Sequence, residues 1–360
     1  MDSVFTQSPR LVAWEITRSC NLHCAHCRAS STNEVYPGEL TTKECFNLID
    51  SIVMVGKPIL ILTGGEPLYR NDFFDIAHYA SKKGLRVALG SNGTLIDKAI
   101  CAKLKEIPIS RLAISIDFPI PTLQDEFRGT PGSFNAAIAG IENAIEAGLE
   151  VQINSTITKL NARYLEDLLT LALDMKAVAF HPFMLVPTGR GKALASQELP
   201  PEEYERILNW IFEKQLELGN KMFIKPTDAP HYMRILKQRF TELPLNKESA
   251  QTTGMNSLTR GCLAGTGFCF ISHVGRVQGC GYLDVEAGNV RKSSFGEIWR
   301  ESPLFNELRD LSKIKGKCGI CEFKVVCGGC RARAFETSGD YLAEEPYCVH
   351  QPVNMSTKHS

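Results

Sequence analysis

Short apolar runs alternate with longer amphipathic stretches from Leu11 to about Leu218. The short runs are rich in β-branched residues, as buried parallel strands are, and the longer stretches carry apolar residues at helical spacing. This alternation predicts βα units built around a parallel sheet. The predicted strands are Leu11–Thr17, Pro58–Leu62, Arg86–Leu89, Arg111–Ile116, Glu150–Thr156 and Ala177–Leu185.

Six amphipathic helices follow the strands, and Thr41 with Glu44 forms a capping box at the start of the first. Because a full eight-unit barrel takes about 250 residues, six units in this length predict an α/β fold, a partial (β/α)6 TIM-like barrel. Functional side chains are expected at the C-terminal ends of its strands. The predicted helices are Thr42–Val55, Asp72–Lys83, Ile96–Glu106, Ser133–Ala147, Ala162–Met175 and Pro201–Leu218.

The periodicity weakens after the sixth helix, where Lys, Pro, His and Thr become frequent, and cysteines dominate further on. These shifts in composition predict five segments. They are an N-terminal tail (1–10), the partial barrel (11–219), a bridging segment (220–260), a cysteine-rich domain (261–348) and a flexible tail (349–360).

Composition narrows the classes of function. The 360 residues include 40 basic and 40 acidic side chains, so no net charge attracts nucleic acid or an anionic membrane. No run approaches the roughly 20 apolar residues of a membrane span, and residues 1–10 lack the apolar core of a signal peptide. We therefore expect a cytoplasmic protein. Thirteen cysteines in a large chain of this kind indicate metal rather than disulfides, and oxygen-labile clusters favour an anaerobic host.

Three of these cysteines, Cys20, Cys24 and Cys27, are closely spaced after the first predicted strand. Three thiolates on a cubane iron–sulfur cluster leave one iron open for a small molecule, whereas four would close it. A zinc site is the alternative, and it needs a fourth ligand that His23 or His26 is close enough to provide.

A second motif, Thr63-Gly64-Gly65-Glu66-Pro67-Leu68, follows the second strand. Its glycines let the backbone approach a ligand, and Glu66 is expected to present an exposed carboxylate to an ammonium group. With these two motifs the chain resembles the radical S-adenosylmethionine (radical SAM) superfamily. The resemblance implies a [4Fe-4S] cluster on the three catalytic cysteines, with SAM chelated to the open iron. It also implies that Gly64, Gly65 and Glu66 hold the SAM amino group.

Further residues lie at predicted strand ends. Ser115 and Arg128 match positions that contact SAM in the superfamily, and Asn154 ends the fifth strand. The planar guanidinium of Arg128 suits a carboxylate, although an ordinary surface ion pair is the alternative. For Ser91 and Asn92, taken singly, we favour helix N-caps.

Eight cysteines lie near the C-terminus, and two pairs among them are separated by two residues, which is typical of a metal site. Zinc is an alternative on spacing alone. The pattern resembles the SPASM extension of radical SAM enzymes, which implies one or two auxiliary [4Fe-4S] clusters. By analogy, one set of ligands is Cys262, Cys269, Cys280 and Cys330, and the other is Cys318, Cys321, Cys327 and Cys348. Cys45 and Cys101 lie on predicted helices and are expected to pack in the core.

Four longer runs, beginning at Leu11, His181, Lys225 and Gly267, are similar to the radical SAM haem synthases of the sirohaem-derived haem pathway. This resemblance implies oxidative decarboxylation of two propionates of iron-coproporphyrin III to vinyls, giving haem b. It also implies an iron-porphyrin substrate and a small electron donor of the ferredoxin or flavodoxin type.

The substrate implied by this resemblance is an anionic porphyrin, which needs cationic partners. Candidates are Arg190, Lys192, Lys225 and Arg276, with solvated surface charge as the alternative for each. His231 is a candidate iron ligand or proton acceptor, although a structural histidine is the commoner role.

Other functions remain open. Sister tetrapyrrole enzymes, such as the didecarboxysirohaem deacetylase or a haem d1 enzyme, share the Pro-Thr-Gly-Arg-Gly type of segment at Pro187–Gly191. A peptide maturase is a more distant alternative, disfavoured because only about ten residues precede the first strand. A zinc or iron–sulfur binding module without catalysis is the non-enzymatic alternative.

Overall fold

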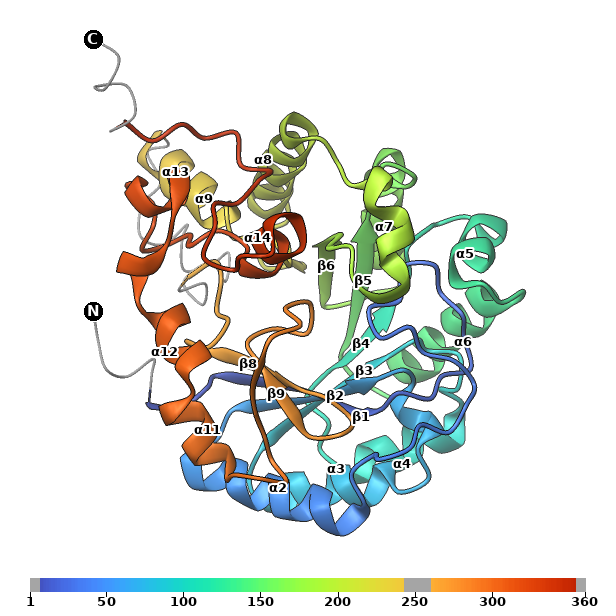
Figure 1. The fold of residues 1–360 in the computed structure, drawn as a ribbon. Helices are drawn as coiled ribbons and strands as arrows, with labels where there is room; N and C mark the ends of the chain where they lie inside the picture. Colours follow the sequence, from blue (N-terminus) through green and yellow to red (C-terminus); the bar gives the residue numbers. More distant parts are fainter. Residues whose placement is uncertain (1–6, 243–259, 354–360) are drawn as a thin grey trace.

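The computed structural model describes residues 7–242 and 260–353, so the two predicted tails and the bridging segment lie partly outside the described residues. One ten-stranded sheet organises the molecule, in the order β10-β9-β8-β1-β2-β3-β4-β5-β6-β7. Strands β1 to β8 pair in parallel, and β9 and β10 are antiparallel additions at one edge. The sheet curves into a partial barrel with helices on its outer face (Figure 1).

The six predicted strands are all present, and their ends differ from the prediction by at most two residues. Residues on alternate sides of each strand pack either under the helices or inside the barrel. The α/β partial barrel is therefore confirmed. Its predicted strands are β1 (Leu11–Thr17), β2 (Ile59–Gly64), β3 (Arg86–Ser91), β4 (Leu112–Ser115), β5 (Val151–Ile157) and β6 (Ala179–Met184).

The predicted helices are also present, and the capping box of Thr41 and Glu44 is formed. Cys45 and Cys101 are fully buried in the core, as expected. The helix predicted over Ala162–Met175 begins with a 3-10 turn, η2 (Ala162–Tyr164). The helices are α2 (Thr42–Val55), α3 (Phe73–Lys82), α4 (Lys98–Glu106), α6 (Ser133–Glu146), α7 (Leu165–Asp174) and α8 (Pro201–Leu218).

The boundary predicted after residue 219 does not coincide with a break in the sheet. A seventh parallel strand, β7 (Phe223–Ile224), pairs with β6, and helix α9 (Tyr232–Glu242) packs on α8. Two residues are too few to show strand periodicity, which is why this strand was missed. Helix α5 (Pro121–Arg128) and the 3-10 segments η1 (Pro67–Tyr69) and η3 (Gly189–Gln197) were also missed.

The cysteine-rich region joins the barrel directly. Strand β8 (Phe268–Ile271) pairs with β1 on the side opposite β2, and β9 (Arg276–Gln278) and β10 (Glu286–Asn289) continue the sheet. Helix α11 (Phe295–Glu301) packs against α2, so both regions share one hydrophobic core. The remaining elements are α12 (Pro303–Arg309), η5 (Leu311–Lys313), α13 (Gly316–Ile320) and α14 (Arg331–Ser338).

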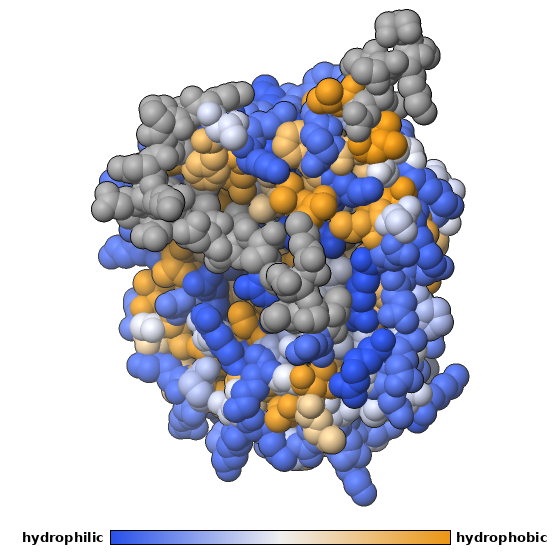
Figure 2. Space-filling model, turned by 90° about the vertical axis from the view of Figure 1, so that its left-hand side faces the viewer, coloured by the Kyte–Doolittle hydropathy of each residue, from blue (hydrophilic) through white to orange (hydrophobic). Residues whose placement is uncertain are grey.

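Hydrophilic and apolar residues intermingle on the face shown in Figure 2. Within residues 7–242 and 260–353, no helix is both long and apolar enough to span a bilayer.

Candidate active site

The three N-terminal cysteines lie on the loop after β1, pressed against the Gly-Gly-Glu turn after β2. The amide groups of Gly65 and Glu66 donate to the carbonyls of Thr17 and Ser19, both at 2.9 Å. A Cβ atom on Gly65 would lie 2.4 Å from the Ser19 carbonyl oxygen, so only glycine permits this approach. The two motifs that lie about forty residues apart in sequence therefore share one backbone interface.

Hydrogen-bond donors lie close to the sulfur atoms of the three N-terminal cysteines. The amides of Leu22 and Ser31 lie 3.4 and 3.3 Å from Sγ of Cys20 and Cys27, and Arg128 Nη1 lies 3.8 Å from Sγ of Cys24. Burial raises the pKa of Cys20 to about 12 and also raises that of Cys24. Thiols buried in this way become thiolates only on a cationic metal centre, which the surrounding donors would stabilise.

The same loop does not match a mononuclear zinc site. Among the described residues, only Cys321, Glu322 and His350 form a group of three or more metal-type ligands with atoms all within 4.8 Å of one another. His26 stacks on Phe127 at 4.6 Å, and His23 is exposed. The N-terminal thiols thus lack the close tetrahedral grouping that zinc requires.

Glu66 is fully buried, which corrects the expectation of an exposed carboxylate. It accepts hydrogen bonds from the Ser91 hydroxyl at 2.9 Å and from the amides of Asn92 and Leu68 at 2.8 and 3.2 Å. Burial raises the pKa of Glu66 to about 7, although these donors oppose the shift. Ser91 and Asn92 therefore position this carboxylate, and Asp97, not either of them, caps α4.

Arg128 is buried at 5% exposure and forms an ion pair with Asp117 at 2.5 Å, so it is not the surface ion pair considered as an alternative. Its carboxylate partner in the structure is a residue of the chain itself. Ser115 is the last residue of β4 and pairs in register with Asn154, the middle residue of β5. Asn154 also accepts from Gln152 Nε2 at 2.7 Å, which fixes its amide inside the barrel.

Two of the cations predicted to bind substrate are engaged elsewhere. Arg190 donates from Nε to the Cys24 carbonyl and from Nη1 to the Ser31 carbonyl, both at 2.9 Å, so it braces the cysteine loop. Lys192 is exposed and pairs with Glu336 at 3.5 Å. The porphyrin-binding role of both therefore stays a prediction, and the contacts in the structure give each side chain another partner.

Lys225 has the placement expected of a substrate residue. It lies two residues beyond Phe223, so the two side chains share one face of the chain. The Phe223 ring lies 6.0 Å from the ring of His181, which contacts Gln152 inside the barrel at 3.1 Å. Burial lowers the pKa of Lys225. No ion pair of Lys225 is found within the described part of the chain.

His231 and Arg276 are not in the barrel interior. Arg276 pairs with Asp284 and Glu286 on the surface, at 3.2 and 2.9 Å. The His231 ring is buried, stacks on Tyr204 at 4.7 Å and borders a cavity among the C-terminal cysteines. Burial lowers the pKa of His231 well below its usual range, so the ring is neutral. This position corrects the expectation of an iron-porphyrin ligand.

That cavity has an empty volume of about 410 Å³ and is lined by four cysteines, which we call the distal cysteines. Backbone amides of Glu345, Phe323 and Gly329 point at three of their sulfur atoms, at 3.3 to 3.4 Å. This grouping agrees with the second predicted ligand set. The distal cysteines are Cys318, Cys321, Cys327 and Cys348.

Three other cysteines, Cys262, Cys280 and Cys330, lie close together: in addition to the larger effect of burial, Cys262 and Cys330 raise the pKa of Cys280, and Cys262 raises that of Cys330. We call them the proximal cysteines. The Arg333 amide lies 3.5 Å from Sγ of Cys330. Near them, Arg28 donates to the Gly281 carbonyl at 3.4 Å, which ties this group to the loop of the N-terminal cysteines.

Cys269, the fourth member of the predicted ligand set, is placed differently from the proximal cysteines. It lies on β8 next to Phe270, and neighbouring strand residues face opposite sides of a sheet. The Phe270 ring stacks under Arg28 at 4.4 Å, toward the barrel interior. Cys269 therefore faces the helix layer, where Arg309 of α12 is the charged group that acts on its pKa.

Comparison with known proteins fits this arrangement. Residues 14–172 match the radical SAM superfamily, and residues 262–330 match the SPASM iron–sulfur cluster-binding domain. The chain is 51% identical to an AdoMet-dependent heme synthase of Methanosarcina barkeri, over 96% of this chain and 98% of that relative. The chain belongs to the radical SAM enzymes that carry a SPASM domain.

Other radical SAM relatives agree. An AdoMet-dependent heme synthase of Oleidesulfovibrio alaskensis is 50% identical over 95% of this chain and 88% of that relative. An Fe-coproporphyrin III synthase of Methanosarcina barkeri is 32% identical over 94% and 87%. SuiB of Streptococcus suis has the same fold, with a TM-score of 0.75 at 16% identity over 96% of this chain and 78% of that chain.

As a radical SAM/SPASM enzyme, the chain uses SAM with a [4Fe-4S] cluster, and its SPASM domain binds auxiliary iron–sulfur clusters. The residues present fit these groups. The loop after β1 offers three buried thiols with facing donors, and the Gly-Gly-Glu turn beside it offers backbone groups and a buried carboxylate. The proximal and distal cysteines form two further sets in the SPASM region.

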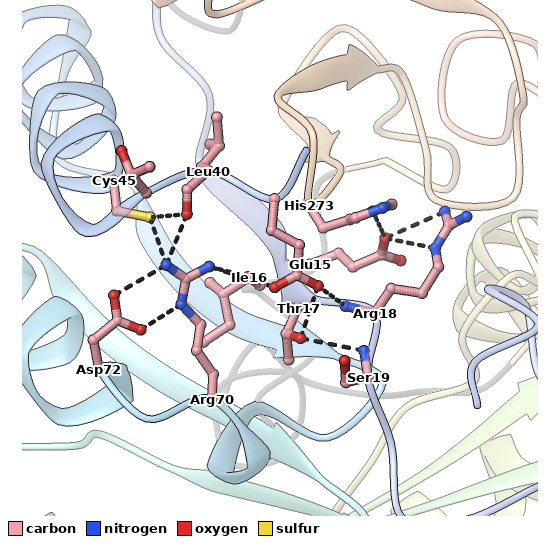
Figure 3. Close-up of polar contacts among 12 residues, drawn as sticks. Glu15, Ile16, Thr17, Arg18, Ser19, Leu40, Cys45, Arg70, Asp72 and His273 are labelled. Atoms are coloured by element: carbon pink, nitrogen blue, oxygen red, sulfur yellow. Dashed lines mark hydrogen bonds and ion pairs between the residues drawn. The ribbon is translucent and has the colours of Figure 1, made fainter. Parts of the chain in front are cut away.

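Sequence reasoning missed several polar residues that hold this site. Asp117 directly follows the fourth predicted strand and was given no role, yet its partner Arg128 reaches Cys24. Glu15 is fully buried on β1 and accepts from His273 of the SPASM region at 2.6 Å, as Figure 3 shows. A lone acidic residue within an apolar strand was the available signal, because such a carboxylate needs a buried partner.

Proposed function

We propose that this enzyme is a haem synthase that converts two propionate side chains of iron-coproporphyrin III to vinyl groups, giving haem b. The main support for this proposal is that about half of all residues are identical to those of two AdoMet-dependent heme synthases, over nearly the whole chain. The proposal includes a cytoplasmic location and a small electron donor of the ferredoxin or flavodoxin type.

The half-reaction on the substrate balances with the cofactors of the family. SAM at a reduced cluster supplies a 5′-deoxyadenosyl radical, which takes one hydrogen atom from the β-carbon of a propionate. The substrate radical then loses CO₂ and one electron, and a carbon–carbon double bond forms. One electron therefore leaves for each propionate converted, and the cysteine sets of the SPASM region offer a place for an acceptor.

The residues of the chain supply binding and orientation. Glu66 and the glycines beside it would hold the SAM amino group near the N-terminal cysteines. Lys225, which directly follows β7, would supply the cation that pairs with a propionate. A charge-assisted bond of this kind contributes about 1.5–3 kcal/mol to binding.

Anaerobic reconstitution followed by incubation with SAM, a reductant and iron-coproporphyrin III tests the proposal. Mass spectrometry should show a monovinyl intermediate and then the divinyl product, with 5′-deoxyadenosine formed in step. Formation of 5′-deoxyadenosine without any vinyl product would contradict it. Loss of acetate from didecarboxysirohaem in a parallel reaction would instead assign the chain to the sister deacetylases.

A Lys225→Met variant, with Lys192→Met as control, tests the substrate contact. Lys225→Met should weaken iron-porphyrin binding by about ten- to hundredfold, measured by titrating the porphyrin absorbance, while iron content stays that of the parent. Lys192 lies on the surface, so its substitution should leave porphyrin binding unchanged. Equal affinities in both variants would exclude Lys225 as a substrate residue.

A further inference from the structure

Asp228 has a left-handed backbone conformation, which few non-glycine residues adopt. Its φ is +57°, and among the described residues only Ser30 and Lys176 are other non-glycine residues with a positive φ. This left-handed region is strained for a side chain with a Cβ, and such strain persists only where the surrounding structure enforces it. The conformation of Asp228 is therefore held in place by specific contacts.

Those contacts are on the backbone. The Asp228 carbonyl accepts from the Tyr204 hydroxyl at 2.9 Å and from Arg333 Nη1 at 3.1 Å. The side-chain carboxylate, unlike the backbone carbonyl, has an oxygen without a partner. Its Oδ2 atom is buried, and no hydrogen bond to it is found among the described residues. A buried carboxylate oxygen without a partner is costly, so this atom indicates a ligand.

Besides burial, the charges of Arg333 and Lys225 act on the pKa of the Asp228 carboxyl, and the charge of Asp228 in turn reaches two of the proximal cysteines. The charge of Asp228 adds to the larger effect of burial in raising the pKa of Cys280, and it also raises the pKa of Cys330. The chain just after Asp228 packs on the start of the SPASM region, since a Cβ on Gly261 would lie 2.6 Å from the Pro230 carbonyl oxygen. The loop after β7 therefore brings the segment that contains Asp228 next to the segment that contains Cys262.

The proximal cysteines number three, one fewer than an all-thiolate cubane needs. The fourth cysteine predicted from the sequence, Cys269, faces the helix layer on the opposite side of β8. We propose that Asp228 supplies the fourth protein ligand, through a carboxylate oxygen, to the auxiliary cluster held by the proximal cysteines. The inference concerns the cluster alone and does not depend on which tetrapyrrole is the substrate.

An oxygen ligand has a chemical consequence. Replacing thiolate ligands with less electron-donating ones raises the reduction potential of an iron–sulfur cluster. The iron bound by Asp228 is also the one most easily lost on oxidation, because the carboxylate binds iron less strongly than a thiolate does. The proximal cluster should therefore accept an electron more readily than the distal one.

The test uses a background in which Cys20, Cys24 and Cys27 are all replaced by alanine, so that only auxiliary clusters remain. Asp228→Asn keeps the shape of the side chain and tolerates a positive φ, and Asp228→Cys restores a thiolate. Cys269→Ala is the matched control. Each protein is reconstituted anaerobically, and iron and sulfide content, EPR spectra and midpoint potentials are measured.

The background protein should hold about eight irons, as two four-iron clusters require. Asp228→Asn should lose one iron on mild oxidation and show the EPR signal of a three-iron cluster. Asp228→Cys should keep full iron content, with a lower midpoint potential and an altered EPR spectrum for one cluster. Cys269→Ala should match the background in every measurement.

Two results would overturn the proposal. One is an Asp228→Asn protein whose iron content, oxidation behaviour and EPR spectra equal those of the background. The other is a Cys269→Ala protein that loses iron from one cluster, since this would make Cys269 the ligand. If Asp228→Asn fails to fold, the unchanged or shifted potential of Asp228→Cys decides the question by itself.

Discussion

Glu66 shows how burial sets the function of a single side chain. The carboxylate has no exposed surface, and its neighbours Ser91 and Asn92 donate to it while burial raises its pKa to about 7. At this pKa a substantial fraction of the carboxyl group is protonated near neutral pH. Only the ionised form accepts a hydrogen bond at both oxygen atoms from the SAM amino group.

The affinity for SAM should therefore rise with pH as Glu66 ionises, through about 7. Glu66→Gln cannot ionise, so this dependence should flatten and binding should weaken by about ten- to hundredfold, as expected for one lost charge-assisted bond. Equilibrium dialysis of anaerobic protein at several pH values measures both effects. The iron content of the variant should equal that of the parent, and a pH profile identical in both proteins would exclude this role.

The residues of the site could be predicted where they belong to a motif, but the directions of their side chains could not. The three N-terminal cysteines and the Gly-Gly-Glu turn are brought together where the strand ends predict them. Glu66 is buried instead of exposed, and Cys269 faces away from the other cysteines of its predicted ligand set. Both differences concern which face of the chain a residue occupies, which spacing in the sequence does not reveal.

At the scale of elements, the cysteine loop is clamped by three segments. The turn after β2 packs on one side, and the carbonyls of Arg128 and Phe127 at the end of α5 accept hydrogen bonds from the amides of His23 and Ala25, at 3.2 and 2.9 Å. The segment η3 contributes Arg190, which bridges two carbonyls of the loop. These hydrogen bonds hold the backbone of the loop from three sides.

Arg190→Met should loosen this clamp by removing two hydrogen bonds from a charged donor, each contributing about 1.5–3 kcal/mol. We expect faster loss of iron from the N-terminal cluster, measured by EPR and iron release to a chelator, with the auxiliary clusters unchanged. Lys192→Met, on the same segment, is the control and should behave like the parent. Unchanged iron retention together with weakened porphyrin binding would support the substrate role first predicted for Arg190.

Long periodic elements were predicted well, and short ones were not. The ends of α2 and α8 are as predicted because fourteen and eighteen residues give several turns of apolar spacing. Strand β7 has two residues and draws its stability from pairing with β6, a long-range contact that no local pattern encodes. Helix α9 was missed because it follows this strand within a segment of weak periodicity.

At the scale of the whole molecule, the strands of the SPASM region are part of the barrel sheet and not a separate appended unit. Strand β8 pairs with β1, and the buried Glu15 of β1 bonds to His273 just beyond β8 (Figure 3). Arg28 forms an ion pair with Glu15 at 2.5 Å and stacks over Phe270. The loop that carries the N-terminal cysteines is thus fixed to both regions through one carboxylate.

Burial alone would raise the pKa of Glu15, but the charge of Arg28, the bond from His273 and the charge of Arg18 together lower it to about 2. A carboxyl pKa that falls on folding contributes stability above its unfolded value, near 4.5, and loses it as the pH drops toward 2. Between pH 5 and 8, about the range in which proteins are most stable, this contribution is therefore constant. It differs in this respect from Glu66, which titrates within that range.

Glu15→Gln should lower the free energy of unfolding by about 3–5 kcal/mol, because it leaves Arg28 buried without a counter-charge. Thermal unfolding of anaerobic protein should show a midpoint several degrees below that of the parent, with the same gap at every pH from about 5 to 8. Glu286→Gln is the matched control, since Glu286 pairs with Arg276 on the surface and such pairs contribute at most about 1 kcal/mol. Equal midpoints for both variants would mean that the two regions are joined by strand pairing and apolar packing alone. A large gap for Glu15→Gln would instead show that one buried carboxylate holds the radical SAM loop and the SPASM strand in a single unit.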